Sequence, residues 1–220
     1  MAGSGASMSW ASMSWTSAFG RGCGVLLDTI VRWLALSRIN PNVLTFMGLV
    51  VNTWAAILFG SATVLTQRHL FFYAGLVIIF SGFFDLVDGR VARASNKVTR
   101  FGGFFDSIVD RYSDASLFLG LLVFYGRGNR FFYVVLAALA MISAIMVSYA
   151  RARAESLIGT CRVGFMERPE RLVLLIIGAL FNVMAPVLWV IAVLSTITVI
   201  HRIIYTWQRT TEMDAPARAA

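Results

Sequence analysis

Residues 83–114 read FFDLVDGRVARASNKVTRFGGFFDSIVDRYSD, and five of the eleven acidic residues of the chain fall in this one stretch. These five residues are Asp85, Asp88, Asp106, Asp110 and Asp114. The surrounding chain is strongly apolar, because 58% of its 220 residues are hydrophobic and only 14% are charged. In a typical soluble domain about a quarter of all residues are charged. The composition therefore predicts an all-α integral membrane protein, in which the five acids need a specific explanation.

Six apolar runs, each near the ~20 residues that a membrane-spanning helix needs, follow one another along the chain. They cover residues 42–65, 70–93, 102–125, 131–154, 169–186 and 188–207. The pair Asn40-Pro41 opens the first run as a helix cap followed by proline at the first helical position. A tight turn at residues 182–186 separates the last two runs. We therefore expect six transmembrane helices within a membrane domain at residues 40–208.

The two ends of the chain differ from this domain. Residues 1–20 are small and polar and predict a flexible tail, and residues 209–220 predict a second tail. In residues 21–39 the apolar positions are interrupted by Asp28, Arg32 and Arg38, so the segment is too charged to cross a bilayer. This pattern is typical of an amphipathic helix that lies in the membrane interface.

The distribution of basic residues predicts the orientation in the membrane. With the N-terminus in the cytoplasm, fifteen of the nineteen Lys and Arg residues fall in cytoplasmic segments and three fall on the opposite side. Cytoplasmic segments carry such an excess, so both termini and the acidic stretch are expected at the cytoplasmic face of the inner (cytoplasmic) membrane. The net charge of +8 then matches an anionic membrane surface, and no nucleic acid partner is expected.

Helical spacing places the acids on two stripes. In the second run the stripe holds Asp85, Asp88, Gly89, Ala92 and Arg93, and in the third it holds Gly102, Asp106, Asp110 and Asp114. Four carboxylates from two helices can hold two Mg²⁺ or Mn²⁺ ions about 4 Å apart, and such a pair can clamp a phosphate. Spacing alone leaves two alternatives open: a cation-coupled membrane transporter, and a scaffold of Asp–Arg ion pairs.

The pattern Asp85-x-x-Asp88-Gly89-x-x-Ala92-Arg93, followed after eight residues by Gly102-x-x-x-Asp106-x-x-x-Asp110, resembles the full signature of the CDP-alcohol phosphotransferases. The resemblance covers roughly residues 22–208. It implies that a CDP-linked lipid, usually CDP-diacylglycerol, reacts with an alcohol and that CMP leaves. It also implies that Asp85, Asp88 and Asp106 bind metal, and that Asp110 binds the second metal and is the catalytic general base.

The same resemblance implies a nucleotide site and a dimer. The cytidine pocket would lie near Gly89, Ala92 and Arg93, with Asn42 and Thr45 contributing from the first helix. A homodimer would form through residues 102–125 and 131–154, where Gly120 and the small residues 137–144 permit close packing. Asp114 lies one turn beyond the signature and is expected to be an ion-paired residue or to support the metal ligands.

A second cluster bears on the identity of the alcohol. Arg151, Arg153, Arg168 and Arg171 converge on the cytoplasmic side, with Arg168 and Arg171 at a helix start. Such a group binds phosphate well, although the positive-inside rule alone would also put arginines there. The strings 151–155 (RARAE) and 167–171 (ERPER) resemble the family members that use inositol phosphate. This likeness implies that Arg168 and Arg171 grip the inositol-bound phosphate and that Arg151 or Arg153 completes the pocket.

The leading interpretation is therefore a phosphatidyltransferase that joins CDP-diacylglycerol to inositol phosphate, with release of CMP. Within the same class, a phosphatidylglycerophosphate synthase would use glycerol 3-phosphate. From a different class, the cation-coupled transporter stays open, although it leaves Gly89, Ala92 and Gly102 unexplained.

Overall fold

The computed structural model describes residues 40–94 and 99–219, with the side chains of residues 86, 88, 89, 92, 94 and 216–219 outside the description. The predicted tail at 1–20 and interfacial helix at 21–39 lie outside the described residues. The part that is described is helical and contains no strand. Its six helices are α2 (Pro41–Ser61), α3 (Gln67–Ala94), α4 (Arg100–Arg127), α5 (Phe131–Ile158), α6 (Arg168–Leu180) and α7 (Met184–Ala219).

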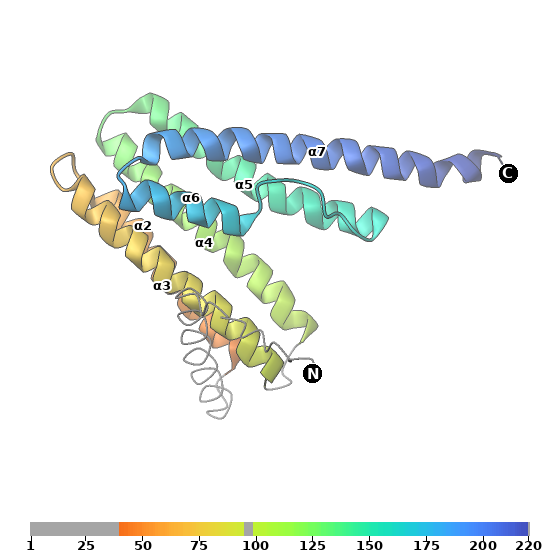
Figure 1. The fold of residues 1–220 in the computed structure, drawn as a ribbon, viewed down its shortest axis with the longest axis horizontal. Coiled ribbons are helices and arrows are strands. Elements are labelled where there is room, and N and C mark those ends of the chain that lie inside the picture. Colours follow the sequence, from red (N-terminus) through yellow and green to blue (C-terminus); the bar gives the residue numbers. More distant parts are fainter. Residues whose placement is uncertain (1–39, 95–98, 220) are drawn as a thin grey trace, which may run out of the picture.

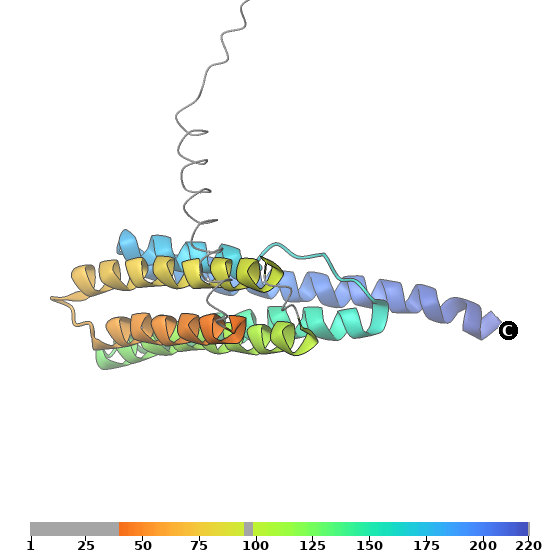
Figure 2. The same ribbon diagram turned by 90° about the horizontal axis from the view of Figure 1, so that it is seen from below.

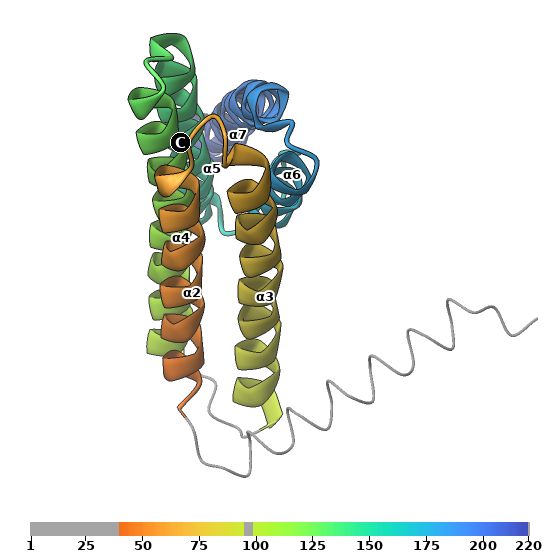
Figure 3. The same ribbon diagram turned by 90° about the vertical axis from the view of Figure 1, so that its left-hand side faces the viewer.

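The helices pack in a closed ring (Figures 1 and 3). α2 packs against α3 and α4, α3 against α6, α6 against α7, α7 against α5, and α5 against α4. Seen from below, α3 and α6 lie in one layer and α2 and α4 lie in the other (Figure 2). The two helices that carry the acidic stripes therefore both border α2 and face the interior of the same ring.

Local sequence signals account for several of the helix boundaries. The Asn40 side chain accepts a hydrogen bond from the Asn42 backbone N–H at 3.1 Å, and Pro41 begins α2, as the sequence predicted. Thr99 caps α4 in the same way by accepting from the Gly102 N–H at 2.9 Å. Asn182 adopts φ 57° in the turn between α6 and α7. This left-handed conformation, which Asn tolerates better than most residues, ends α6.

Four of the predicted membrane spans are confirmed as helices that are long and apolar enough to cross a bilayer: Pro41–Ser61, Gln67–Asp85, Phe131–Ile158 and Met184–Ala215. α4 has the necessary length, but acids and arginines interrupt its apolar sequence. α6 has only 13 residues, so the predicted span at 169–186 is too long. The chain turns at Phe181 and Asn182, and Pro186 lies in the first turn of α7 rather than in the connection.

The hydrophobic core fills the end of the ring away from the acidic stripes. Phe71 contacts both Phe59 and Phe124 edge-to-face, each with ring centroids 4.9 Å apart. Around these rings lie fully buried residues of every described helix, among them Leu117, Leu175 and Leu188. Edge-to-face aromatic pairs add to the burial of apolar area. This end of the bundle is therefore a rigid base for the polar end.

The small residues that the sequence assigned to a dimer contact are used inside the chain. A Cβ at Gly120 would lie only 2.3 Å from the Ala56 carbonyl oxygen, so α2 and α4 can approach closely only because residue 120 is glycine. Ala137, Ala140 and Ala144 are buried in the core. The assignment of Gly120, Ala137, Ala140 and Ala144 to an intermolecular surface is therefore wrong, whereas Ala138 and Ser143 of the same range are only half-buried.

Gly120→Ala should lower the unfolding temperature of the detergent-purified protein by roughly 5 °C or more, because the added methyl group must push α2 away from α4. Gly126→Ala, in the same helix, is the matched control. A Cβ at residue 126 meets nothing closer than 4.0 Å, so this variant should melt like the wild type. Equal melting of the two variants would show that the α2–α4 contact is looser than described.

Candidate active site

The acidic stripes of α3 and α4 meet at the guanidinium group of Arg168, the first residue of α6. Arg168 Nη2 lies 3.0 Å from Asp85 Oδ2 on α3, and Arg168 Nη1 lies 2.9 Å from Asp110 Oδ1 on α4. Arg168 Nε is 3.5 Å from Asp114 Oδ1. One cation thus joins carboxylates from two helices that are separate in the ring.

A second, more buried ion pair lies directly behind the first. Arg171 Nη2 donates to Asp114 Oδ2 at 2.6 Å, and the Arg171 side chain is only 2% exposed. Asp114 is therefore shared by two arginines of α6, three residues apart on one helix face. The expectation that Asp114 is an ion-paired residue is confirmed. Its position fixes the start of α6 against α4.

The chemistry of the carboxylates fits a divalent cation. Asp106 lies close enough to Asp85, Arg168 and Arg111 to interact with their charges. Because Arg171 neutralises Asp114, the carboxylates of Asp85, Asp106 and Asp110 outnumber the two remaining guanidinium groups, those of Arg111 and Arg168. Hard oxygen ligands of this kind suit Mg²⁺ or Mn²⁺. Among the side chains that are described, no three acids, histidines or cysteines form a metal-binding group as they stand. The fourth expected ligand, Asp88, is not among those side chains.

Of the expected nucleotide-binding residues, Asn42 lies at the start of α4, the helix that carries Asp106 and Asp110. A Cβ at Gly102 would lie 3.4 Å from Asn42 Oδ1, so α2 brings Asn42 to the start of α4. Thr45 is buried one turn further along α2. A Cβ at Gly48 would lie 3.1 Å from Asp85 Oδ1, which shows how closely the α2 backbone approaches the acids. Arg93 is exposed, and the surroundings of Gly89 and Ala92 lie outside the description.

A cavity of about 500 Å³ opens next to Asp110. Its charged lining comes from α4, α5, α6 and α7, and its residues are Ser107, Asp110, Arg111, Asp114, Val147, Ser148, Arg151, Ala152, Glu155, Glu167, Arg168, Pro169 and Arg202. Of the signature carboxylates whose side chains are described, Asp110 lines this cavity and Asp85 and Asp106 do not. The cavity therefore touches the acidic centre at the residue that the sequence singled out as the base.

The four arginines expected to bind phosphate take different positions. Arg151 and Arg168 line the cavity, whereas Arg171 lies behind it on Asp114. Arg153 is exposed, donates to Ser156 Oγ at 3.4 Å, and is not among the cavity residues. The structure thus brings Arg151 and Arg168 to the cavity and Arg171 to Asp114, and it leaves Arg153 aside.

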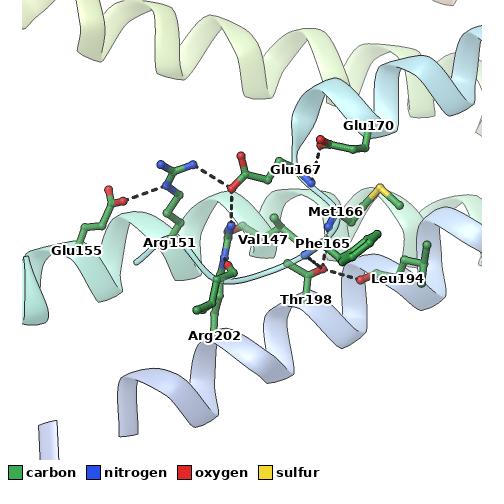
Figure 4. Close-up of polar contacts among 11 residues, drawn as sticks. Val147, Arg151, Glu155, Phe165, Met166, Glu167, Glu170, Leu194, Thr198 and Arg202 are labelled. Atoms are coloured by element: carbon green, nitrogen blue, oxygen red, sulfur yellow. Dashed lines mark hydrogen bonds and ion pairs between the residues drawn. The ribbon is translucent and has the colours of Figure 1, made fainter. Parts of the chain in front are cut away.

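Arg202 of α7 is a cavity residue that sequence reasoning counted only as a cytoplasmic charge. Its side chain is 1% exposed and donates to the carbonyl oxygens of Val147 at 2.6 Å and Val163 at 2.8 Å. It also lies 3.0 Å from Glu167 Oε1 (Figure 4). Burying an arginine within an apolar helix costs free energy unless its charge is paired or used in function. The position of Arg202 in an apolar run was therefore the signal in the sequence that could have identified it.

Glu167 connects the arginines of the cavity. Its Oε1 accepts from Arg151 Nη1 at 3.1 Å and from Arg202 Nη2 at 3.0 Å, so one carboxylate orients side chains from α5 and α7 (Figure 4). Arg151 Nε also donates to Glu155 at 3.0 Å. Glu167 precedes α6, and its backbone N–H donates to Glu170 Oε2 at 3.0 Å. These contacts hold the guanidinium groups in fixed directions before a ligand arrives.

A family model described as CDP-alcohol phosphatidyltransferase matches residues 38–207. The chain therefore belongs to the CDP-alcohol phosphatidyltransferase family, and it is an enzyme of that class. With its apolar helices, it is a multi-pass membrane protein. The resemblance that the signature carried is confirmed, and the transporter alternative is set aside.

Two relatives within this family are named for the reaction that they catalyse. The chain is 37% identical over 178 residues to the archaetidylinositol phosphate synthase of Pyrococcus horikoshii, which covers 80% of this chain and 88% of that protein. It is 32% identical over 208 residues to the phosphatidylinositol phosphate synthase of Streptomyces avermitilis, which covers 88% of this chain and 83% of that one. Both relatives are named for products that contain inositol phosphate.

Solved structures show the same fold. Mycobacterium tuberculosis phosphatidylinositol phosphate synthase with CDP-DAG bound superposes with a TM-score of 0.71 at 30% identity, covering 82% of this chain and 93% of that one. The same enzyme in complex with manganese and citrate superposes with a TM-score of 0.69 at 30% identity, covering 82% and 88%.

Breaking the Asp114–Arg171 pair on one side should destabilise the protein strongly, by about 3–5 kcal/mol, because a buried charge is left unpaired. Asp114→Leu and Arg171→Met should each lower the unfolding temperature in detergent, and the double variant should melt above both. Arg209→Met is the control, because Arg209 pairs with Glu212 at the surface and such pairs contribute little. A double variant that melts below both single variants would contradict the pairing.

Proposed function

We propose that this enzyme transfers the phosphatidyl group of CDP-diacylglycerol to inositol phosphate, forming phosphatidylinositol phosphate and releasing CMP. The observation that carries the proposal is the arginine-lined cavity beside Asp110. Guanidinium groups from Arg151, Arg168 and Arg202 line this cavity and suit a phosphate on the acceptor. A volume of about 500 Å³ is adequate for a phosphorylated polyol.

The relatives support inositol phosphate rather than glycerol 3-phosphate as the acceptor, since their names refer to inositol phosphate products. They differ in the lipid, because one is named for an archaetidyl product and the other for a phosphatidyl product. A solved neighbour at 30% identity has CDP-DAG bound, which supports diacylglycerol as the lipid of the donor.

Metal ions complete the site in the proposed mechanism. Asp85, Asp88, Asp106 and Asp110 would hold two Mg²⁺ or Mn²⁺ ions, which when bound would neutralise the diphosphate of the donor and acidify the hydroxyl of the acceptor. The excess of carboxylates over arginines at this centre supports such ligands. A neighbouring structure in complex with manganese supports the choice of metals.

Asp110 is the general base of this mechanism. It accepts the proton of the acceptor hydroxyl as that oxygen attacks the phosphorus that carries the lipid. A new phosphorus–oxygen bond forms while the bond from the same phosphorus to the CMP oxygen breaks, and CMP leaves with the bonding electrons. Arg151, Arg168 and Arg202 hold the acceptor by its phosphate, so its hydroxyl is presented to Asp110.

The remaining roles follow from the family resemblance. Asn42, Thr45 and Arg93, with the small residues Gly89 and Ala92, would form the cytidine pocket beside the metals. The proposed orientation places the site at the cytoplasmic face of the inner membrane, because the basic residues concentrate there. A homodimer through α4 and α5 would use their exposed apolar faces, since Gly120 and the core alanines are already buried.

Asp110→Asn should reduce CMP release by at least about a hundredfold, because an amide cannot accept the proton. Binding of Mn²⁺, followed by electron paramagnetic resonance, should be weakened but retained through the other three carboxylates. Asp214→Asn, at the exposed end of α7, is the control and should turn over like the wild type. Full turnover by Asp110→Asn would remove Asp110 from the role of base.

The choice of acceptor is tested by supplying purified enzyme with radiolabelled CDP-diacylglycerol and one acceptor at a time. CMP release is expected with inositol phosphate and not with free inositol or serine, because only the phosphorylated acceptor offers charged oxygens to the cavity arginines. Glycerol 3-phosphate should be a poor acceptor. If it supports turnover and inositol phosphate does not, the enzyme is a phosphatidylglycerophosphate synthase instead.

A further inference from the structure

The connection between α5 and α6, residues 159–167, is fastened to α7 by Thr198. The Thr198 hydroxyl accepts hydrogen bonds from the backbone N–H groups of Phe165 at 3.2 Å and Met166 at 3.0 Å. It donates its own proton to the Leu194 carbonyl oxygen at 2.8 Å (Figure 4). Thr198 is 1% exposed, so water cannot replace these bonds. A single buried hydroxyl therefore satisfies two consecutive N–H groups of the connection.

Gly164 lets the connection lie flat on α7. Its φ of 117° belongs to a region that residues with a Cβ rarely adopt. A Cβ there would lie 2.5 Å from Thr198 Cγ2 and 3.2 Å from Arg202 Nε. The preceding carbonyl, that of Val163, accepts from Arg202 Nε at 2.8 Å. The backbone conformation of Gly164 and these side-chain contacts thus fix the same four residues, 163–166.

This stretch leads directly into the charged lining of the cavity. Met166 is followed by Glu167, which binds Arg151 and Arg202, and then by Arg168, which reaches Asp85 and Asp110. A shift of the connection along α7 would therefore move the three arginines relative to the acids. Thr198 is not among the residues that line the cavity, so any effect it has on the acceptor must act through them.

We propose that Thr198 is a positioning residue for the acceptor site, which holds the connection 159–167 on α7 so that Arg151, Arg168 and Arg202 are preset for the acceptor phosphate. The proposal rests on the proposed function, because it takes the cavity to be the acceptor site. Preset guanidinium groups bind a phosphate more tightly, since less side-chain freedom is lost on binding. The donor and metal residues lie on α2, α3 and α4, and the connection reaches two of them, Asp85 and Asp110, through Arg168.

Thr198→Val tests the proposal, because valine keeps the branched shape and removes the hydroxyl. The buried N–H group of Met166 and the part-buried N–H group of Phe165 lose their acceptor, and we expect the KM for inositol phosphate to rise about tenfold. The kcat and the KM for CDP-diacylglycerol should change less than about twofold. Thr198→Ser keeps the hydroxyl and should restore the wild-type KM. Thr210→Val is the matched control, because Thr210 bonds only to carbonyl oxygens of α7 itself.

A second pair of variants tests the contact without removing the hydroxyl. Gly164→Ala should also raise the KM for inositol phosphate, because the new methyl group meets Thr198 Cγ2. Gly164→Ala combined with Thr198→Ser removes that methyl contact and should recover part of the affinity, although the strained φ persists. Melting curves in detergent accompany each variant. Equal effects of Gly164→Ala with Thr and with Ser at position 198 would show that the two residues act independently.

The outcomes separate this inference from the proposed function. Wild-type enzyme that releases no CMP with inositol phosphate would overturn the proposed acceptor, whatever the variants do. Wild-type enzyme that does so, with an unchanged inositol phosphate KM in Thr198→Val, would overturn the positioning role alone. A parallel rise in the KM values of donor and acceptor would also overturn it, because that result indicates general loosening of the bundle.

Discussion

Acidic side chains inside an apolar bundle repel one another unless positive charge is placed among them, and α6 supplies that charge at its first turn. Arg168 binds Asp85 and Asp110 from two different helices, and Arg171 neutralises Asp114 behind them. Repulsion between carboxylates that share a site is strong in a medium of low dielectric constant. These ion pairs therefore connect α6 to α3 and α4, in addition to the hydrophobic core, and they hold the start of α6 at the acidic centre.

The ion pairs that hold the helices together at the polar end of the molecule also determine the shape of the cavity. Glu167, Arg168 and Arg171 are close together in sequence, yet they bind partners on α3, α4, α5 and α7. The short connection before them has few side chains of its own to pack, and it depends on Thr198 and Arg202 of α7 for its hydrogen bonds. Residues far apart in the chain thus determine the shape of one cavity, and this is typical of sites that must be rigid before a charged ligand arrives.

Much of this could be predicted from the sequence, because the signals were local. The start of α2 at Asn40-Pro41 and the two acidic stripes follow from helix capping and helix geometry. The family followed from the resemblance of residues 85–110 to its signature. The turn near Asn182 was expected from the sequence, but α6 was predicted too long because apolar residues continue past Asn182 as far as Pro186. Arg202 was missed because its partners are distant in sequence. Gly120 was assigned to a dimer contact because the sequence cannot distinguish a glycine that packs against a helix of the same chain, here α2, from one that packs against a second chain.

The length of α6 has a consequence for where the reaction takes place. Thirteen helical residues extend about 20 Å, which is less than the ~30 Å hydrocarbon layer. The far end of α6 is level with the start of α3, where Gln67 donates to Asn182 at 2.8 Å, and α3 continues from Asp85 to Ala94 for about another 14 Å. The acidic centre thus lies about 14 Å short of the end of α3 and not at the tip of the bundle. For the proposed reaction, this depth means that a water-soluble acceptor would enter a charged cavity within the bundle, whereas the lipid donor would react with its chains still in its own leaflet.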